Sequence, residues 1–335
     1  MTDNEFNELE PSEALEMYVA VREPEVREST IRSIRSRVGL FVEWCEREGI
    51  QQLYELDGMD LHRYRLKTAR DVAKLTLISR LSSVRMFLRW ARSVDAVEPE
   101  LPERIEIPDG ERARTRYLES GAAEDILRFL EKYRYASRDH AMMLLTWETG
   151  ARIGAIRSLD VRDYDAEEPC VSFKHRPETD TPIKNGRNGE RVVGLAGGTR
   201  EVIDAYLSHN RVDVRDDHGR DPLLTTAHGR PSNTTMQRTI YRLTRPCIYD
   251  GGCPHDKDPD ECPAANDSDI ASKCPSSVSA HDVRRGYLTY LSREEVPKAV
   301  ISDRCDVSPD VLEKHYNQMT DREKMDARRD YLDGL

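Results

Sequence analysis

The chain has 335 residues, of which 38% are hydrophobic and 34% are charged, and its formal net charge is −11. This length favours two domains, each with a lean hydrophobic core and a highly charged surface. No run of about 18 apolar residues occurs, so we expect no membrane-spanning helix and no membrane partner. The acidic segment MTDNEFNELEPSE lacks the basic and apolar parts of a signal peptide, which leads us to expect a cytoplasmic protein.

The charge is unevenly distributed along the sequence. Residues 27–95 contain 14 Lys and Arg against 9 Asp and Glu, a local net charge of +5, which leaves −16 for the remainder. Overall acidity argues against nucleic acid as a partner, because DNA binders gain affinity by neutralising phosphates. A basic segment within an acidic chain is nevertheless compatible with a DNA-binding protein whose remaining surface is strongly hydrated.

Two amphipathic helices are predicted within this basic segment. The first spans 29–48, with Ser29 as its N-cap and Gly49 as its stop, and the second spans about 75–93. Both carry arginines beside their apolar stripe. One such helix is explained by an ordinary solvated face, whereas two in one small domain favour contacts with DNA phosphates. The residues that we predict to contact DNA are Arg32, Arg35, Arg85, Arg89 and Arg92.

A proline-rich, charged stretch at 96–116 interrupts the helical pattern and contains an Asp109-Gly110 turn signal. We interpret it as the region that joins two domains. The predicted organisation is, in chain order, a helical DNA-binding domain at 10–97, a linker at 98–113 and a second domain at 114–335.

The second domain combines helices with two short strands. The predicted elements, in chain order, are helices at 122–133 and 138–148, strands at 170–174 and 191–195, and further helices after residue 281. Ser137 and Gly150 are expected to bound the second of these helices. The sequence therefore predicts a mostly α fold with a small β-sheet.

Three motifs in the second domain carry groups suited to phosphate chemistry. Arg152 follows a glycine that ends an apolar helix, in the sequence TGARIGAIRSLDVRDYD. His281 and Arg284 are three positions apart in AHDVRRGYLTYL, so a helix would place them on one face, where the guanidinium could donate two bonds to a phosphate. Tyr316 lies in DVLEKHYNQ, on a helix that Pro309 could begin. Each motif alone is more often structural than catalytic.

In this order and at these separations, the three motifs resemble the catalytic domain of the tyrosine recombinases, a family that includes phage integrases and the Xer recombinases. The resemblance covers nearly the whole chain, because the basic helical domain is similar to the SAM-like core-binding domain of that family. It implies a helical core-binding domain followed by a tyrosine recombinase catalytic domain. The acidity of the chain is also typical of proteins from salt-loving organisms.

The resemblance implies a role for each motif. It assigns the arginines that bind the scissile phosphate to Arg152 and Arg284, the nucleophile to Tyr316 and the proton-transfer histidine to His281. The segment IKNGRNGERVVGL resembles the hairpin that carries the family's general-acid lysine, which makes Lys184 the candidate and Lys174 the alternative. A 3′-phosphotyrosyl bond would retain the energy of the phosphodiester, so no cofactor is expected in catalysis.

Two positions depart from the family's pattern. The acidic residue that usually stands three positions after the first arginine is Ala155 here, which leaves its support of the arginines to be compensated elsewhere. The histidine or tryptophan that usually precedes the tyrosine is also missing, and Asp306 or Val307 occupies its place. His315 is a possible replacement, although adjacent helical residues point in different directions.

Residues 247–274 form a cysteine-rich, acidic insertion within the second domain. The candidate ligands of a structural zinc ion are Cys247, Cys253, Cys262 and Cys274, with His255 as a substitute. Their spacing lacks the C-x-x-C pairs of common zinc fingers, and a flexible acidic loop with free thiols is an equally weighted alternative. A metal would order a segment that has few apolar residues.

Together these features predict a site-specific DNA recombinase or integrase that cleaves and rejoins double-stranded DNA. The resemblance implies a homotetramer that acts on two DNA sites. Two alternatives remain: a type IB topoisomerase-like enzyme that nicks and reseals, and a DNA-binding regulator that has lost catalysis on the same fold. Ala155 and the missing histidine favour the regulator, whereas retention of all three motifs favours an enzyme.

Overall fold

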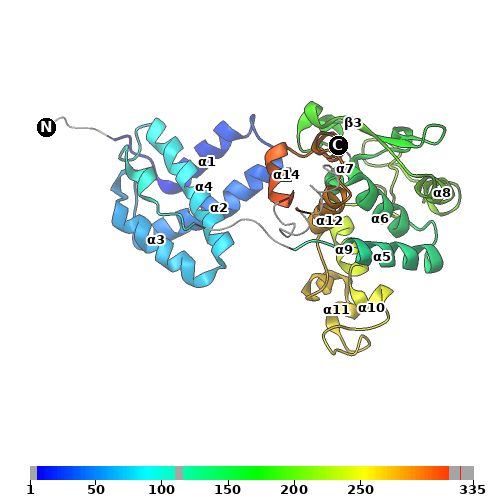
Figure 1. The fold of residues 1–335 in the computed structure, drawn as a ribbon. Coiled ribbons are helices and arrows are strands. Elements are labelled where there is room, and N and C mark those ends of the chain that lie inside the picture. The colour runs from blue at the N-terminus through cyan, green and yellow to red at the C-terminus, as the bar shows by residue number, and fades with distance from the viewer. Residues whose placement is uncertain (1–5, 110–115, 317–324, 326–335) are drawn as a thin grey trace. The chain divides into compact units, whose positions relative to one another are not determined.

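The computed structural model describes residues 6–109, 116–316 and 325. By internal contacts the chain divides into two compact units, Met1–Arg114 and Thr115–Leu335, and each is described by itself. The described residues are mostly helical and include one sheet of three strands, which confirms the predicted fold class (Figure 1). In this part of the chain, no helix combines the length and the hydropathy needed to cross a membrane.

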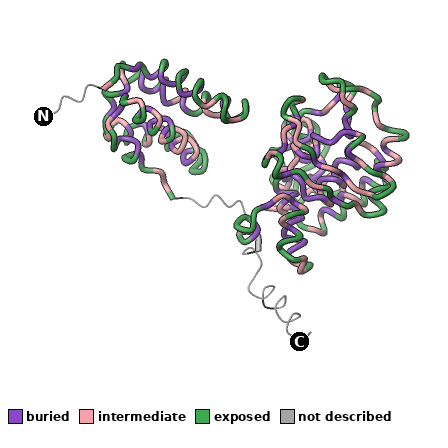
Figure 2. Tube along the Cα trace, turned by 90° about the horizontal axis from the view of Figure 1, so that it is seen from above, coloured by how far each residue is buried: buried purple, intermediate pink, exposed green. Residues whose placement is uncertain are grey.

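The first unit is a small helical bundle. Its elements are α1 (Pro11–Arg22), α2 (Glu28–Glu48), η1 (Leu53–Glu55), α3 (Gly58–Asp71), α4 (Lys74–Ser93) and η2 (Leu101–Arg104). Their apolar faces meet in a core in which the rings of Phe41, Trp44 and Tyr64 pack against one another. Figure 2 shows buried residues on the inward side of these helices and exposed residues on the outward side.

Helix α2 ends where the sequence predicted but begins earlier. Its N-cap is Arg27, in extended backbone and without a side-chain hydrogen bond, so the predicted Ser29 cap is wrong. The chain already turns into the helix at Glu28, whose carboxylate complements the positive end of the helix dipole. Gly49 ends the helix in the left-handed conformation, with φ 80°, as predicted.

The stretch that was predicted to be a linker begins within the first unit. Leu101 and Ile105 are buried in the core of this unit, and η2 packs against α4. These apolar residues therefore fix the chain beyond residue 97. Residues 110–113 of the predicted linker lie outside the described part of the chain.

The second unit surrounds a three-stranded antiparallel sheet with helices. Its first elements are α5 (Ser120–Tyr133), α6 (Arg138–Thr149), α7 (Ile153–Ser158), η3 (Val161–Asp163), β1 (Tyr164–Asp165), β2 (Cys170–Phe173), η4 (Pro177–Thr179), η5 (Gly186–Gly189), β3 (Arg191–Gly194), α8 (Gly197–Ala205) and η6 (Tyr206–Asn210). The strands are in the order β1-β2-β3, and Val171 is opposite Val193. The helices and strands predicted in this stretch are present, with ends within two residues of the predicted ones.

The C-terminal half of this unit is helical. Its elements are α9 (Asn233–Leu243), α10 (Pro246–Tyr249), α11 (Pro263–Asn266), η7 (Ser268–Lys273), α12 (Ala280–Arg293), α13 (Lys298–Cys305) and α14 (Pro309–Tyr316). The short elements α10, α11 and η7 belong to the cysteine-rich insertion. Helices α12 to α14 carry the second and third motifs, so the helices predicted after residue 281 are confirmed.

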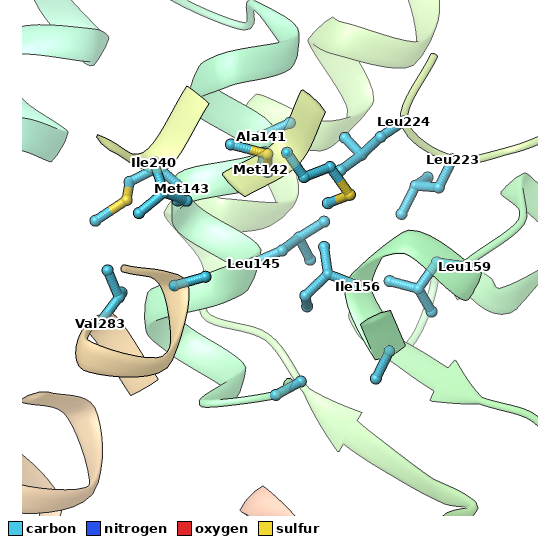
Figure 3. Close-up of a cluster of buried hydrophobic side chains, with 14 of the residues drawn as sticks. Ala141, Met142, Met143, Leu145, Ile156, Leu159, Leu223, Leu224, Ile240 and Val283 are labelled. Carbon is cyan, nitrogen blue, oxygen red and sulfur yellow. The ribbon is translucent and has the colours of Figure 1, made fainter. Parts of the chain in front are cut away.

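Helix α6 is the centre of the core of the second unit. It contributes Ala141, Met142, Met143 and Leu145, which pack between α7, α9 and α12 in Figure 3. Ser137 caps its N-terminus by accepting a hydrogen bond from the backbone N–H of His140 at 3.2 Å, as predicted. Because α6 is buried on nearly all sides, its C-terminal end is a rigid starting point for the first motif.

A buried ionic network holds the other end of α7. The carboxylate of Asp160 is 2% exposed and accepts hydrogen bonds from Arg220 and Arg230, with Oδ1 at 2.7 Å and 2.5 Å from their Nη2 atoms. Arg176 donates two bonds to Asp163, at 2.8 Å and 2.6 Å. Paired in this way, the buried charges are compensated and fix α7 to the loop that precedes α9.

Candidate active site

The first motif forms a tight turn between α6 and α7. Gly150 ends α6 in the left-handed region with φ 56°, and a Cβ atom there would lie 2.6 Å from Tyr287 and 2.8 Å from the sulfur of Cys305. The position therefore requires glycine for both its backbone angle and its space. Arg152 follows as the N-cap of α7 and is about one-third exposed.

Arg284 lies on α12, which begins with a capping box between Ser279 and Asp282. Its side chain is buried and donates three hydrogen bonds to backbone carbonyls, from Nη1 to Gly150 at 2.6 Å and to Cys305 at 2.5 Å, and from Nη2 to Asp306 at 3.1 Å. Burial lowers its pKa to about 10, with a further contribution from the charge of Arg152. The guanidinium is still cationic at neutral pH.

Asp306 joins the first and second motifs. Arg152 Nη1 donates to its carbonyl oxygen at 2.9 Å and to its carboxylate Oδ2 at 2.6 Å. The other carboxylate oxygen accepts a bond from Asn185 Nδ2 at 2.6 Å. Val307 is buried, so Asp306 is the residue that faces the arginines at this position. The acidic group absent at Ala155 is therefore supplied to Arg152 by a residue far along the chain.

Arg191 is a third cation of the site that the sequence interpretation missed. It begins β3, donates from Nε to the Arg304 carbonyl at 2.8 Å and from Nη1 to the Gly189 carbonyl at 3.0 Å, and lies over the ring of Phe173. Burial lowers its pKa, and the charge of Asp306 opposes this effect. The signal in the sequence was the basic residue in the GERVV segment of the hairpin.

His281 occupies the first turn of α12 and is exposed. The protein atoms around the ring desolvate it and lower its pKa, and the charges of Arg285 and Arg284 add to this effect. The neutral form is therefore favoured near neutral pH. Such an imidazole can accept or donate a proton, which suits a role in proton transfer.

The two candidate lysines differ in their surroundings. Lys184 is exposed in the loop between β2 and β3, directly before Asn185, which binds Asp306. Lys174 follows β2 and lies 4.0 Å from the carboxylate of Glu190. The loop of Lys184 is thus connected to the arginine site through its neighbour, whereas Lys174 forms an ion pair on the hairpin.

Tyr316 is the last residue of α14, which begins at Pro309 as the sequence predicted. The side chains of Tyr316 and His315 lie outside the described part of the structure. Helix α14 packs against α12 and α13 and inserts Leu312 into a cluster that includes Tyr287. The third motif is thereby attached to the helix that carries Arg284.

Four of the five arginines predicted to contact DNA have partners within the first unit. Arg85 donates to the carbonyl of Ile105, and Arg89 makes two bonds to Glu103, at 2.9 Å and 3.0 Å. Arg92 is exposed. Arg32 and Arg35, on α2, pair with Glu28 and Glu16. Part of the arginine stripe on α4 therefore faces residues 103–105 of its own unit.

A separate groove of about 430 Å³ is lined by residues of α1, α2 and α4. Its lining combines apolar side chains, those of Tyr18, Ile34 and Met86, with hydroxyl and basic side chains that were not among the predicted DNA contacts. The latter include Thr30, Ser33, Arg37, Ser79, Ser82 and Ser83. The four serine hydroxyls already donate to backbone carbonyls within their own helices.

The cysteine-rich insertion encloses a pocket. Its lining includes all five candidate zinc ligands, namely Cys247, Cys253, His255, Cys262 and Cys274. All four cysteines are free thiols, and burial raises the pKa of Cys247. Within the described residues, no three His, Cys, Asp or Glu side chains are arranged so that they could hold a metal ion. The donor types suit zinc, but the thiols as placed do not form a ligand set.

Comparison with known proteins gives consistent results. Residues 19–94 match the family described as phage integrase, N-terminal SAM-like domain. A tyrosine recombinase XerC of Corynebacterium glutamicum is 25% identical over 243 residues, which cover 68% of this chain and 69% of the relative. A probable integrase/recombinase of Methanocaldococcus jannaschii is 22% identical over 201 residues, or 58% of each protein, so less than two thirds of that relative is spanned.

Two solved structures share the fold. The Tn1549 transposon integrase in complex with a circular intermediate DNA matches with a TM-score of 0.70 and 14% identity, over 97% of this chain and 99% of that chain. A lambda integrase dimer bound to a COC′ core site matches with a TM-score of 0.63 and 11% identity, over 92% and 78%. Residues 19–94 are therefore similar to an integrase N-terminal domain, the chain has recombinase relatives, and it shares its fold with these two integrases.

Proposed function

We propose that this protein is a site-specific DNA recombinase or integrase that cleaves and rejoins double-stranded DNA through a 3′-phosphotyrosyl intermediate. The observation that carries the proposal is the arginine cluster in the second unit. Arg152, Arg191 and Arg284 come from three separate segments and interact electrostatically with one another. The Asp306 carboxylate balances only one of these three positive charges. The cluster can therefore bind a further anion, and guanidinium groups bind phosphate through paired hydrogen bonds.

Each candidate residue then has a chemical role. Arg152 and Arg284 bind the non-bridging oxygens of the scissile phosphate and stabilise the charge that develops during attack. Tyr316 attacks phosphorus, the bond to the 5′ oxygen breaks, and Lys184 supplies the proton that this oxygen takes up. His281 assists proton transfer. Rejoining reverses the step with a 5′-hydroxyl of another strand, so the phosphotyrosyl bond supplies the energy.

The experiment that tests the proposal is covalent trapping. Wild-type protein is incubated with nicked DNA of its source replicon, so that the short strand released by cleavage diffuses away. Denaturing gels should show a protein–DNA adduct, and sequencing of the trapped 3′ ends should identify one site. Strand exchange between two such sites distinguishes a recombinase from a topoisomerase-like enzyme, which only reseals. DNA binding without any adduct would favour a regulator that has lost catalysis.

We predict that Lys184→Ala slows adduct formation by about 10²-fold or more, because general-acid catalysis typically contributes 10²–10⁴-fold. A substrate with a 5′-thiol leaving group should restore the rate, since a thiolate leaves without a proton. Lys132→Ala, an exposed lysine on α5, is the control. If the thiol substrate instead rescues Lys174→Ala, the general acid is Lys174 and the assignment to Lys184 is wrong.

The mode of DNA binding is also a proposal. The first unit contacts phosphates through Arg32, Arg35, Arg85, Arg89 and Arg92. Those arginines that have internal partners exchange them for phosphates on binding. The functional assembly is a homotetramer on two DNA sites, acting in the cytoplasm. The DNA complexes of the Tn1549 and lambda integrases, which share this fold, support DNA as the partner.

We further propose a structural zinc ion in the cysteine-rich insertion. Its support is the pocket that all four cysteines and His255 line, and metal binding would require these side chains to rearrange into a ligand set. Elemental analysis of purified protein should give about one zinc per chain. Cys262→Ser should lower that content, whereas Cys170→Ser, outside the insertion, should not. Protein without metal whose four insertion thiols are freely alkylated would contradict the proposal and leave the recombinase assignment intact.

A further inference from the structure

Asp306 is the point at which the two phosphate-binding arginines meet. Its carbonyl oxygen accepts bonds from both Arg152 and Arg284, and its carboxylate accepts from Arg152 and Asn185. One residue therefore connects the first motif, the second motif and the hairpin loop that precedes β3. The contact between Arg152 and Asp306 could not be predicted from the sequence, because the two residues are 154 positions apart.

The backbone of Asp306 is suited to this task. The residue ends α13 in the left-handed region, with φ 52° and ψ 60°. Residues other than glycine rarely adopt this conformation, and aspartate and asparagine tolerate it best. The turn lets the carbonyls of Cys305 and Asp306 accept from Arg284 while the Asp306 carboxylate reaches Arg152. Strained backbone of this kind is often found at functional sites.

The bonds to Asp306 restrict how Arg152 can bind a phosphate. Both leave from Nη1 of the guanidinium. A guanidinium has five N–H donors, two on each terminal nitrogen and one on Nε. With Nη1 held, the plane of the group is fixed, and the edge formed by Nε and Nη2 is the one suited to two parallel bonds to phosphate oxygens. Asp306 thus determines which edge faces the substrate.

The carboxylate also acts on charge and on the hairpin. Neighbouring arginines repel Arg191 and Arg284 and lower their pKa values. The negative charge of Asp306 raises both pKa values and so offsets part of this repulsion. The carboxylate also accepts a hydrogen bond from Asn185, which directly follows Lys184 in the chain, and so restrains this loop. Removal of the carboxylate should therefore loosen the guanidinium of Arg152 and the loop of the candidate general acid together.

We propose that Asp306 is a positioning residue that orients Arg152 toward the scissile phosphate and keeps the Lys184 loop beside it. The inference rests on the proposed recombinase function. The alternative is that the carboxylate only occupies the phosphate site, and the two ideas predict opposite effects of the carboxylate on the cleavage rate. A positioning carboxylate speeds cleavage, whereas a competing carboxylate slows it and weakens DNA binding.

The test uses two variants and a matched control. Asp306→Gly removes the carboxylate and tolerates the positive φ, and Asp306→Asn retains the left-handed turn and one acceptor oxygen. Asp303→Asn changes an exposed aspartate of the same helix. At saturating DNA, we expect Asp306→Gly to slow adduct formation by about 10²-fold, Asp306→Asn to lie between it and wild type, and Asp303→Asn to match wild type. The Kd for DNA should stay within about twofold, because many phosphate contacts share the affinity.

A second readout in the DNA-free protein separates this inference from the proposed function. The Nε–H resonance of Arg152, assigned by its loss in Arg152→Lys, should shift or broaden in Asp306→Gly and stay unchanged in Asp303→Asn. An Asp306→Gly enzyme that cleaves at the wild-type rate or faster would overturn the positioning role. If the wild type forms no adduct, the proposed function fails, and the resonance then decides: an unchanged Arg152 signal overturns the inference and a changed one supports it. If Asp306→Gly does not fold, Asp306→Asn provides the same comparisons.

Discussion

Tyr316→Phe should abolish the covalent protein–DNA adduct while the affinity for DNA stays within about twofold of wild type. The substitution removes one oxygen atom, the one proposed to attack phosphorus, and keeps the ring. A tyrosine hydroxyl has a pKa near 10, so it attacks at neutral pH only where cations or a proton acceptor assist it. Under the proposed mechanism, Arg152 and Arg284, which lie in the same unit as Tyr316, supply that assistance.

The measurement is trapping on nicked DNA, followed by digestion of the adduct and identification of the DNA-linked peptide. Tyr133→Phe, at an exposed tyrosine on α5, is the matched control and should form the adduct at the wild-type rate. Persistence of the adduct in Tyr316→Phe would show that another residue is the nucleophile. A variant that also lost DNA binding would show instead that the tyrosine contributes to folding or docking.

The fold and the main candidates could be predicted because they depend on local patterns. Apolar residues at helical spacing defined α2, α4 and α6, and a glycine that must adopt positive φ ended α6. The order of the motifs selected Arg152 and Arg284 among 51 Lys and Arg residues. The three-dimensional structure then brought these two arginines together on the backbone of Asp306.

What could not be predicted depends on contacts between distant segments. The carboxylate that supports Arg152 comes from Asp306, whose left-handed turn no periodic pattern encodes. The bond between Arg89 and Glu103 joins residues 14 positions apart, so a helical stripe alone could not show that its arginine has an internal partner. Arg191 was overlooked because a strand arginine is usually solvent-exposed, whereas this one is enclosed by backbone carbonyls and Phe173.

Replacing Arg152 or Arg284, which we propose to bind the scissile phosphate, should slow adduct formation by about 10²–10³-fold, or roughly 3–4 kcal/mol of transition-state stabilisation. Arg152→Lys and Arg284→Lys keep a positive charge but lose the planar fork, so both should show most of this loss. The two alanine variants should differ in stability. Arg152 is about one-third exposed, and its removal should lower the melting temperature less than the removal of Arg284. Arg284→Ala leaves the carbonyls of Gly150 and Cys305 without this donor, whereas the Asp306 carbonyl keeps its bond from Arg152.

Each unsatisfied buried acceptor costs about 1–3 kcal/mol, so Arg284→Ala should lower the free energy of unfolding measurably as well as slow cleavage. Single-turnover trapping and denaturant unfolding measure the two effects separately, with Arg128→Ala, an exposed arginine on α5, as the control for both. A wild-type cleavage rate in either lysine variant would contradict bidentate phosphate binding by that residue. Equal loss of stability in both alanine variants would contradict the difference that we infer between the two arginines. Arg284 is anchored in the core, whereas Arg152 lies at the edge of the core and is held there by Asp306.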